Sequence, residues 1–112
     1  MRHEARTLEV PTVNGTAGAA RDIRDLQKPA VFLHAVGAVT FDFKLQVKVS
    51  AAQDSNDDWI DLTGSITAKG VYPIADQTTG APLAVTHVRI YRTTNAVGTL
   101  SANVSGLNAR TE

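Results

Sequence analysis

The segment Thr40–Ser50, with the sequence TFDFKLQVKVS, alternates between apolar and polar residues. Apolar residues occupy the odd positions from 41 to 49, and polar residues occupy the even positions from 42 to 48. Successive side chains of a β-strand point to opposite faces, so this period of two predicts a strand with one buried and one wet face. Lys44 and Lys48 on the wet face would also discourage pairing with another chain if the strand lay at the margin of its sheet.

Residue usage extends this prediction to the whole chain. Val and Thr, which branch at Cβ and suit pleated strands, are frequent, whereas Glu occurs only at positions 4, 9 and 112. Patterning predicts further strands at 29–36, 59–62, 71–74, 84–93 and 99–105, separated by Gly37–Ala38, by polar loops at 53–58 and 76–82, and by a hairpin turn at 94–98. The predicted fold is therefore an all-β sandwich of about seven to eight strands, with either jelly-roll or Ig-like topology.

The first 28 residues differ from the rest of the chain. Residues 6–10 have the pattern of a short strand, residues 13–20 are small and glycine-rich, and Arg21 and Asp25 have the (i, i+4) spacing of a helical turn. A segment with so little to bury should be mobile unless a partner holds it. The 112 residues are therefore predicted to form an extended N-terminal arm (residues 1–28) and one β-sandwich domain (residues 29–112).

Composition argues against several classes of function. The chain has no Cys, which excludes disulfides, thiolate metal sites and cysteine nucleophiles. Its 11 basic and 11 acidic residues give a formal net charge of zero, which argues against a nucleic-acid partner. No apolar run approaches the roughly 20 residues that span a bilayer, and the N-terminus has no signal-peptide pattern, so neither a membrane partner nor export is expected.

Motifs for metal binding and catalysis are also lacking. The histidines at positions 3, 34 and 87 do not have the spacing of metal ligands. Asp54–Asp58 has the alternating oxygen donors of a calcium loop, but Trp59 stands where that loop needs Gly and Ser65 where it needs Glu. No nucleophile elbow or phosphate-binding glycine loop is present. The sequence therefore predicts a protein without enzymatic activity, bound metal or cofactor.

The order of the strand motifs resembles a known group of proteins. The motifs are TFDFKLQVKVSAAQDSNDDWIDL, then KGVYPI at 69–74, THVRIY at 86–91 and GTLSANVSG at 98–106. Across about residues 30–107 this order resembles the small β-sandwich domains of tailed-bacteriophage virions, which include capsid decoration (cement) proteins, head-fibre proteins and some tail appendages. In outline it is also similar to discoidin-like and carbohydrate-binding jelly rolls.

The resemblance implies a structural function. A decoration protein binds the outer surface of the capsid and stabilises the shell by bridging major capsid subunits. The implied partner is the major capsid protein, and the implied location is the exterior of the virion, after synthesis in the host cytoplasm. Capsids offer two-fold and three-fold positions, so a homo-oligomer is expected, with a trimer favoured over a dimer.

The N-terminal arm would then be the element that grips the capsid. Extended arms can add a strand to a neighbouring sheet, and arginines can pair with capsid carboxylates. The candidate contact residues are Arg2, Arg6, Val10, Arg21 and Arg24. The equally weighted interpretation of these arginines is a solvated charged face.

Two other functions stay open. One is a carbohydrate-binding module of a phage tail or fibre adhesin, which would expose Trp59, Tyr72 or Tyr91 in a shallow groove. Against it, Trp59 alternates with Ile60, which favours a packed structural Trp over a sugar-stacking one. The other is a structural component of the tail or connector, which would share the fold and differ in its partner.

Overall fold

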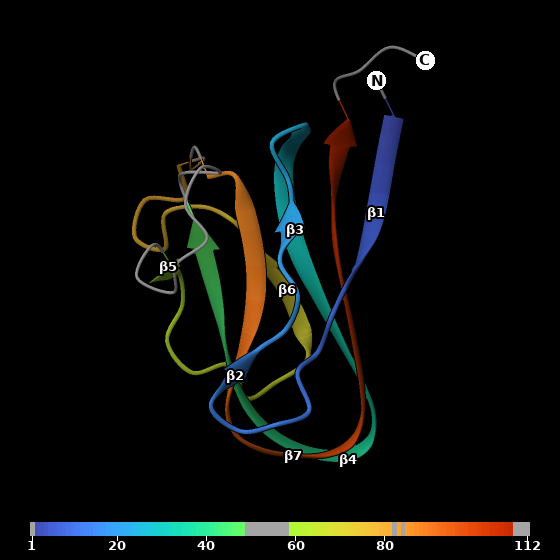
Figure 1. Ribbon diagram of the computed structural model, residues 1–112. Helices are drawn as coiled ribbons and strands as arrows, with labels where there is room; N and C mark the ends of the chain where they lie inside the picture. Colours follow the sequence, from blue (N-terminus) through green and yellow to red (C-terminus); the bar gives the residue numbers. More distant parts are fainter. Residues whose placement is uncertain (1, 49–58, 82, 84, 109–112) are drawn as a thin grey trace.

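The computed structural model describes residues 2–48, 59–81, 83 and 85–108 (Figure 1). Every regular element in this part of the chain is a β-strand, which confirms the all-β prediction. The strands are β1 (Arg2–Leu8), β2 (Thr16–Ala17), β3 (Arg21–Asp22), β4 (Leu26–Lys48), β5 (Trp59–Asp61), β6 (Gly70–Pro73) and β7 (His87–Asn108).

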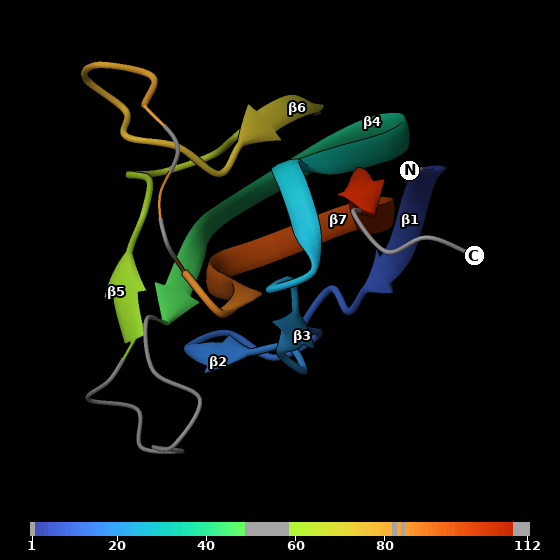
Figure 2. The ribbon, with the colours of Figure 1, turned by 90° about the horizontal axis from the view of Figure 1, so that it is seen from above.

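Two long antiparallel strands, β4 and β7, organise the molecule. Both bend midway, so the ribbon that they form turns back on itself and each strand contributes to two half-sheets (Figures 1 and 2). In the first half-sheet the order is β1, residues 102–108 of β7, residues 26–36 of β4, and β6. In the second, β2 and β3 both pair along one edge of residues 87–92 of β7. Residues 42–48 of β4 pair along the other edge, and β5 pairs with β4. The result is a two-layered antiparallel architecture of the sandwich type.

The sequence predicts strand ends at Gly37–Ala38 and at residues 94–98, and both predictions are wrong. β4 continues through Gly37, and residues 94–98 lie inside β7. Gly37 has a φ of +83°, and the pairing with β7 shifts register between Val36 and Phe43. Such bulges bend a strand without ending it, so the glycine here marks a bend where the sequence pattern indicates a turn.

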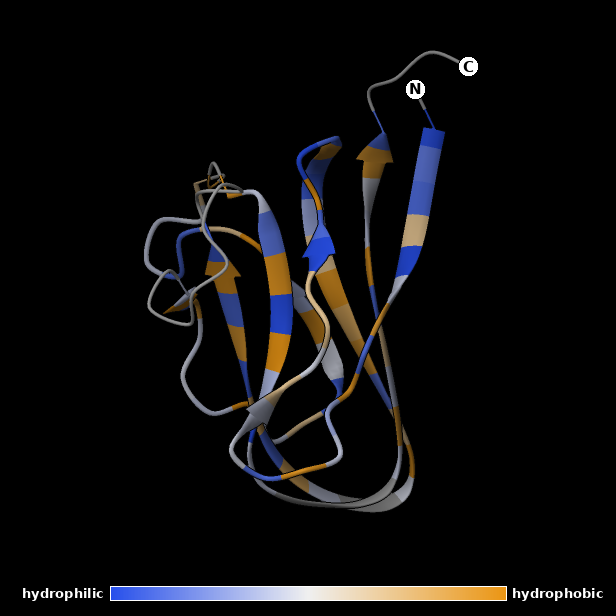
Figure 3. Ribbon diagram, in the orientation of Figure 1, coloured by the Kyte–Doolittle hydropathy of each residue, from blue (hydrophilic) through white to orange (hydrophobic). Residues whose placement is uncertain are grey.

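The core lies between the two half-sheets. The predicted inward side chains of the alternating segment, Phe41, Phe43, Leu45 and Val47, are all buried. They share one cluster with residues of the first part of β4 and of β7, which include Val31, Leu33, Val88, Ile90 and Val104. Apolar and polar residues alternate accordingly along the second half-sheet, in residues 42–48 of β4 and 87–92 of β7 (Figure 3). Lys48 departs from the prediction of a wet face, because it is buried and its ammonium lies 5.8 Å from the ring centroid of Trp59.

The N-terminal segment is part of the sandwich, so the prediction of an extended arm ending at residue 28 is wrong. β1 pairs with β7 without a break, from Arg2 opposite Asn108 to Leu8 opposite Ala102. The predicted helical turn at 21–26 is instead strand β3 followed by a turn that leads into β4. Most large apolar residues of the described segment reach the core: Leu8, Ile23 and Leu26 are buried and Val10 packs against the core cluster, whereas Val13 is exposed.

Residues 14–23 are held to the edge of β7 by backbone hydrogen bonds. The amides of Gly15, Gly18 and Ile23 donate to the carbonyls of residues 92, 90 and 86 at 2.8–2.9 Å. A Cβ on Gly18 would lie 2.3 Å from the carbonyl oxygen of Glu9, so only glycine fits this crossing of the chain. Backbone pairing thus holds residues 14–22, whose side chains contribute little to the core, and it places Ile23 at their end in the core.

Candidate functional site

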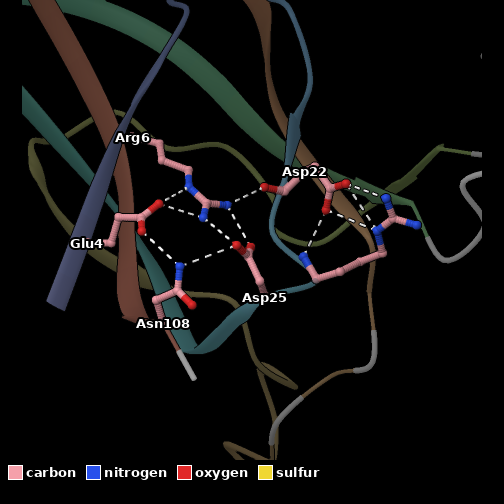
Figure 4. A network of polar contacts seen from close by, with 6 residues as sticks. Glu4, Arg6, Asp22, Asp25 and Asn108 are labelled. Carbon is pink, nitrogen blue, oxygen red and sulfur yellow. Dashed lines mark hydrogen bonds and ion pairs between the residues drawn. The ribbon is translucent and has the colours of Figure 1, made fainter. Parts of the chain in front are cut away.

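A polar network centred on Arg6 joins β1 to the turn before β4 (Figure 4). The guanidinium donates to both carboxylate oxygens of Asp25, at 2.8 and 2.7 Å, to Oε2 of Glu4 at 2.6 Å, and to the carbonyl of Asp22 at 2.8 Å. Nδ2 of Asn108, at the end of β7, donates to Oε1 of Glu4 at 2.9 Å. Planar, two-pronged pairing of this kind fixes geometry as well as charge, so the network fastens three parts of the chain together.

The charges in this network stabilise one another. The hydrogen bonds to Asp25 raise the pKa of Arg6, against the effect of burial. The amide of Asn108 and the guanidinium of Arg6 lower the pKa of Glu4. Arg6 and Asp25 are largely covered, with side chains 17% and 22% exposed. The network is therefore best understood as a structural clasp.

A second and more exposed pair lies next to the first. Arg24 donates to Asp22 from Nη2 at 2.5 Å, and these side chains are 56% and 44% exposed. The hydrogen bond from Arg24 lowers the pKa of Asp22 to about 2. Arg21 joins these two pairs in lining a hollow of about 440 Å³. Because both arginines and aspartates line it, the hollow offers no single-sign surface to a charged partner.

The five predicted capsid contacts therefore do not form one gripping arm. Arg6 and Arg24 are engaged in intramolecular ion pairs, and Val10 packs against the core. Arg21 is exposed on β3, and Arg2 is exposed on β1. The aspartates that pair with Arg6 and Arg24 lie 19 and 2 residues away in the sequence. The sequence pattern does not show these pairs, so it left both arginines as candidates for capsid binding.

Acid should weaken this fold between about pH 4 and pH 2. The pKa of Asp22 is lowered to about 2, and the pKa of Asp61 is lowered by the hydrogen bond from Gln46. A carboxyl whose pKa is depressed in the folded state binds protons first in the unfolded state, so stability is complete above the unfolded pKa near 4 and falls as the pH drops through the folded pKa. Urea unfolding at stepped pH measures this, and Asp22→Asn should flatten the acid limb. If the free energy of unfolding of the variant fell with pH as steeply as that of the parent chain, Asp22 would not be the source of the acid sensitivity.

The outer face of the second half-sheet carries a ladder of polar contacts. Nε of Arg89 donates to Oε1 of Gln46 at 2.8 Å, and Nε2 of Gln46 donates to Oδ1 of Asp61 at 2.9 Å. Nζ of Lys44 lies 3.3 Å from Oδ2 of Asp61. The guanidinium of Arg89 stacks 4.2 Å from the ring centroid of Trp59, and burial lowers the pKa of this Arg. Trp59 is thus half-buried and covered by a cation, as a packed structural Trp would be.

The structure does not bring the three candidate sugar-binding aromatics together. Trp59 and Tyr91 lie on the second half-sheet, and Tyr72 lies on β6 of the first. The hydroxyl of Tyr72 donates to the carbonyl of Ala68, and burial raises its pKa. Tyr91 lines a hollow of about 670 Å³ with Lys44, Gln46, Asp61 and Arg89. This hollow combines the ring of Tyr91 with several polar groups.

An exposed apolar patch lies on the outer face of the first half-sheet. Phe32 on β4 and Val71 on β6 are directly opposite each other and are 39% and 54% exposed. Val36, further along β4, is 58% exposed, and exposed His34 lies between it and Phe32. A hollow of about 670 Å³, which includes Lys69 and Asn103, adjoins them. We call Phe32, His34, Val36 and Val71 the outer patch.

Sequence reasoning missed the outer patch, although a signal was present. The segment VFLHAV at 31–36 has apolar residues at both alternations, whereas TFDFKLQVKV at 40–49 has polar residues at every second position. A strand with apolar residues on both faces either is covered twice or exposes one apolar face. The structure places the second face of this strand at the surface.

The histidines and the acidic residues form no metal centre in the part of the chain that the structure describes. No three His, Asp or Glu side chains gather there in a way that could hold an ion. His34 belongs to the outer patch, and Nδ1 of His87 lies 2.9 Å from Oγ1 of Thr86. The candidate calcium loop at 54–58 lies outside the described residues. Over the same described ranges, no helix has the length and apolar character needed to cross a membrane.

The two outer faces are therefore the candidate binding surfaces. The second half-sheet presents polar groups that already satisfy one another, and the first presents the apolar outer patch. Comparison with protein-family models, with curated proteins and with solved structures finds no match to this chain.

Proposed function

We propose that the protein is a structural protein of a bacteriophage virion that decorates the capsid, and that it binds the major capsid protein through the outer patch. The order of strand motifs, which resembles small virion sandwich domains, supports the assignment to a virion. The integration of residues 2–28 into the sandwich moves the expected contact from the N-terminal segment to the body of the domain. The protein would act from the capsid exterior and as a homo-oligomer.

The observation that carries this proposal is the exposure of the outer patch. Large apolar side chains that lie together on the surface of a small domain usually mark a site of protein contact. Phe32 and Val71 pair across two strands, so they form one continuous apolar surface rather than scattered residues. Lys69 and Asn103 beside them supply the polar margin that is typical of protein interfaces.

The mechanism of such a protein is mechanical. A rigid sandwich that contacts adjacent capsid subunits adds interface area that shell opening must disrupt. A standard interface buries about 1,600 Å² in total, and the many copies on a shell multiply the contribution of each. This function requires a stable fold and an exposed apolar surface that binds protein, and it requires no catalytic group.

Val71→Asp should abolish or greatly reduce binding to capsids. The substitution places a charge in the middle of an apolar contact, and we expect at least a tenfold loss of affinity, equivalent to about 1.4 kcal/mol or more. Co-sedimentation with capsids of the encoding phage, prepared without this protein, measures the effect. Because Val71 is half-exposed on a short edge strand, the variant should remain folded, which circular dichroism checks.

Ile60→Asp is the matched control. Ile60 is 58% exposed, close to the 54% of Val71, and lies on the edge strand β5 of the other half-sheet. It should bind capsids like the parent chain. Equal losses in both variants would move the contact away from the outer patch, and a parent chain that does not bind capsids at all would overturn the assignment to capsid decoration.

The alternative function is carbohydrate binding by a tail or fibre adhesin, and the hollow beside Tyr91 favours it. An aromatic ring next to Gln46, Asp61 and Arg89 offers stacking together with hydrogen bonds. A glycan array tests this alternative. It predicts a signal for the parent chain that Tyr91→Ala abolishes and Val71→Asp leaves intact.

A further inference from the structure

The first half-sheet ends in a long, regular edge strand. β1 has seven residues, and its pairing with β7 runs without a register shift. On its other side, no strand within the described ranges pairs with it, and it forms the outer margin of the sheet (Figure 1). The edge strands β5 and β6 have only three and four residues. A long regular edge is a template for a further strand, whereas short edges are poor ones.

We propose that the added strand is β1 of a second copy, paired antiparallel around Ala5. A two-fold axis perpendicular to the sheet sets one residue of β1 opposite its own copy. In the register centred on Ala5, Arg2 lies opposite Leu8, His3 opposite Thr7, and Glu4 opposite Arg6. All seven residues of β1 are then paired.

Charge selects this register over its neighbours. Centring on Glu4 sets Glu4 against Glu4 and Arg2 against Arg6, and centring on Arg6 sets Arg6 against Arg6. Like charges directly opposite each other destabilise a strand pair, and opposite charges stabilise it. Only the Ala5 register sets each Glu4 beside an Arg6 of the other copy, and it is also longer than the other two by two residues.

The faces of β1 suit such a contact. His3, Ala5 and Thr7 are exposed on one face, and Glu4, Arg6 and Leu8 on the other face are half-buried or buried. Pairing by a perpendicular two-fold axis keeps like faces together, so the polar clasps of the two copies meet along the seam. Ala5 lies on the two-fold axis, where its small side chain is opposite Ala5 of the second copy.

The pairing also has a consequence for capsid binding, and this consequence alone rests on the proposed function. The same symmetry places both outer patches on one side of a continuous sheet. A dimer would therefore present two equivalent apolar contacts to a shell, and engagement of both raises the apparent affinity. Each copy has one long edge, so the assembly closes at two copies, in contrast to the trimer that capsid symmetry favours.

Self-association of the full chain tests the inference without any capsid. Analytical ultracentrifugation of the parent chain should show a concentration-dependent dimer. His3→Lys with Thr7→Lys sets lysine against lysine twice across the seam, on an exposed face, and should weaken dimerisation at least tenfold at low salt. His3→Asp with Thr7→Lys sets opposite charges at the same places and should restore or strengthen the dimer.

The pair of variants is specific to the register. In the Glu4-centred register, position 3 faces position 5, and in the Arg6-centred register position 7 faces position 5, so neither register would separate the two variants in this way. A parent chain that stays monomeric at millimolar concentration would overturn the proposal. Equal self-association of the Lys–Lys and Asp–Lys variants would do the same, whether or not the protein binds capsids.

Discussion

A chain that begins at residue 29 should not fold. Truncation removes β1, β2 and β3, and with them the core side chains Leu8, Ile23 and Leu26. Loss of one buried Leu or Ile side chain costs about 2–5 kcal/mol, and the whole stability of a domain is about 5–15 kcal/mol. Three such losses, together with an unpaired strand edge along β7, exceed what a domain of this size can spare.

Circular dichroism and urea unfolding of residues 29–112 measure this effect. The full chain with Leu8→Ala is the control, because it removes one core side chain and keeps every strand. This variant should unfold cooperatively with a free energy lowered by about 2–4 kcal/mol. Cooperative unfolding of the truncated chain would instead restore residues 1–28 to the status of a separable arm.

The sequence predicts the strands better than it predicts their connections. The alternation from Phe41 to Val47 depends on local geometry alone, and the structure confirms it side chain by side chain. The continuity of β4 could not be predicted in this way, because a glycine with positive φ ends a strand in one fold and bends it in another. What decides between them is the partner strand β7, and pairing between distant segments is not visible in a local pattern.

The same limit applies to the candidate site. Arg6 and Asp25 are 19 residues apart, and only the fold brings them to 2.7 Å. The predicted pair of Arg21 with Asp25 presumed a helical turn, which the pairing of β3 with β7 replaces. The outer patch was more accessible to sequence reasoning, because the apolar run at 31–36 lacks the polar alternation of its neighbour.

Arg6→Ala should destabilise the protein far more than Arg24→Ala. Without the Arg6 guanidinium, the carboxylate of Asp25 loses its two hydrogen bonds from Arg6 and stays 22% exposed, although Nδ2 of Asn108 still lies 3.4 Å from Oδ2. Removing one partner of a well-covered ion pair leaves the other charge less well compensated, so we expect a loss of about 2–3 kcal/mol, less than for a fully buried pair. Arg6→Lys should lie between the two, because it keeps the charge and loses the two-pronged geometry.

Arg24 provides the matched comparison for this prediction. Arg24 forms an ion pair of similar length with Asp22, two residues earlier in the chain, but both side chains are about half exposed. Exposed pairs are screened by water and salt, so Arg24→Ala should lower the urea midpoint at neutral pH much less than Arg6→Ala does. Parallel urea titrations of the three variants measure the difference. Equal midpoints for Arg6→Ala and Arg24→Ala would mean that the clasp does not fasten β1, and residues 2–8 would then be held by backbone pairing with β7 alone.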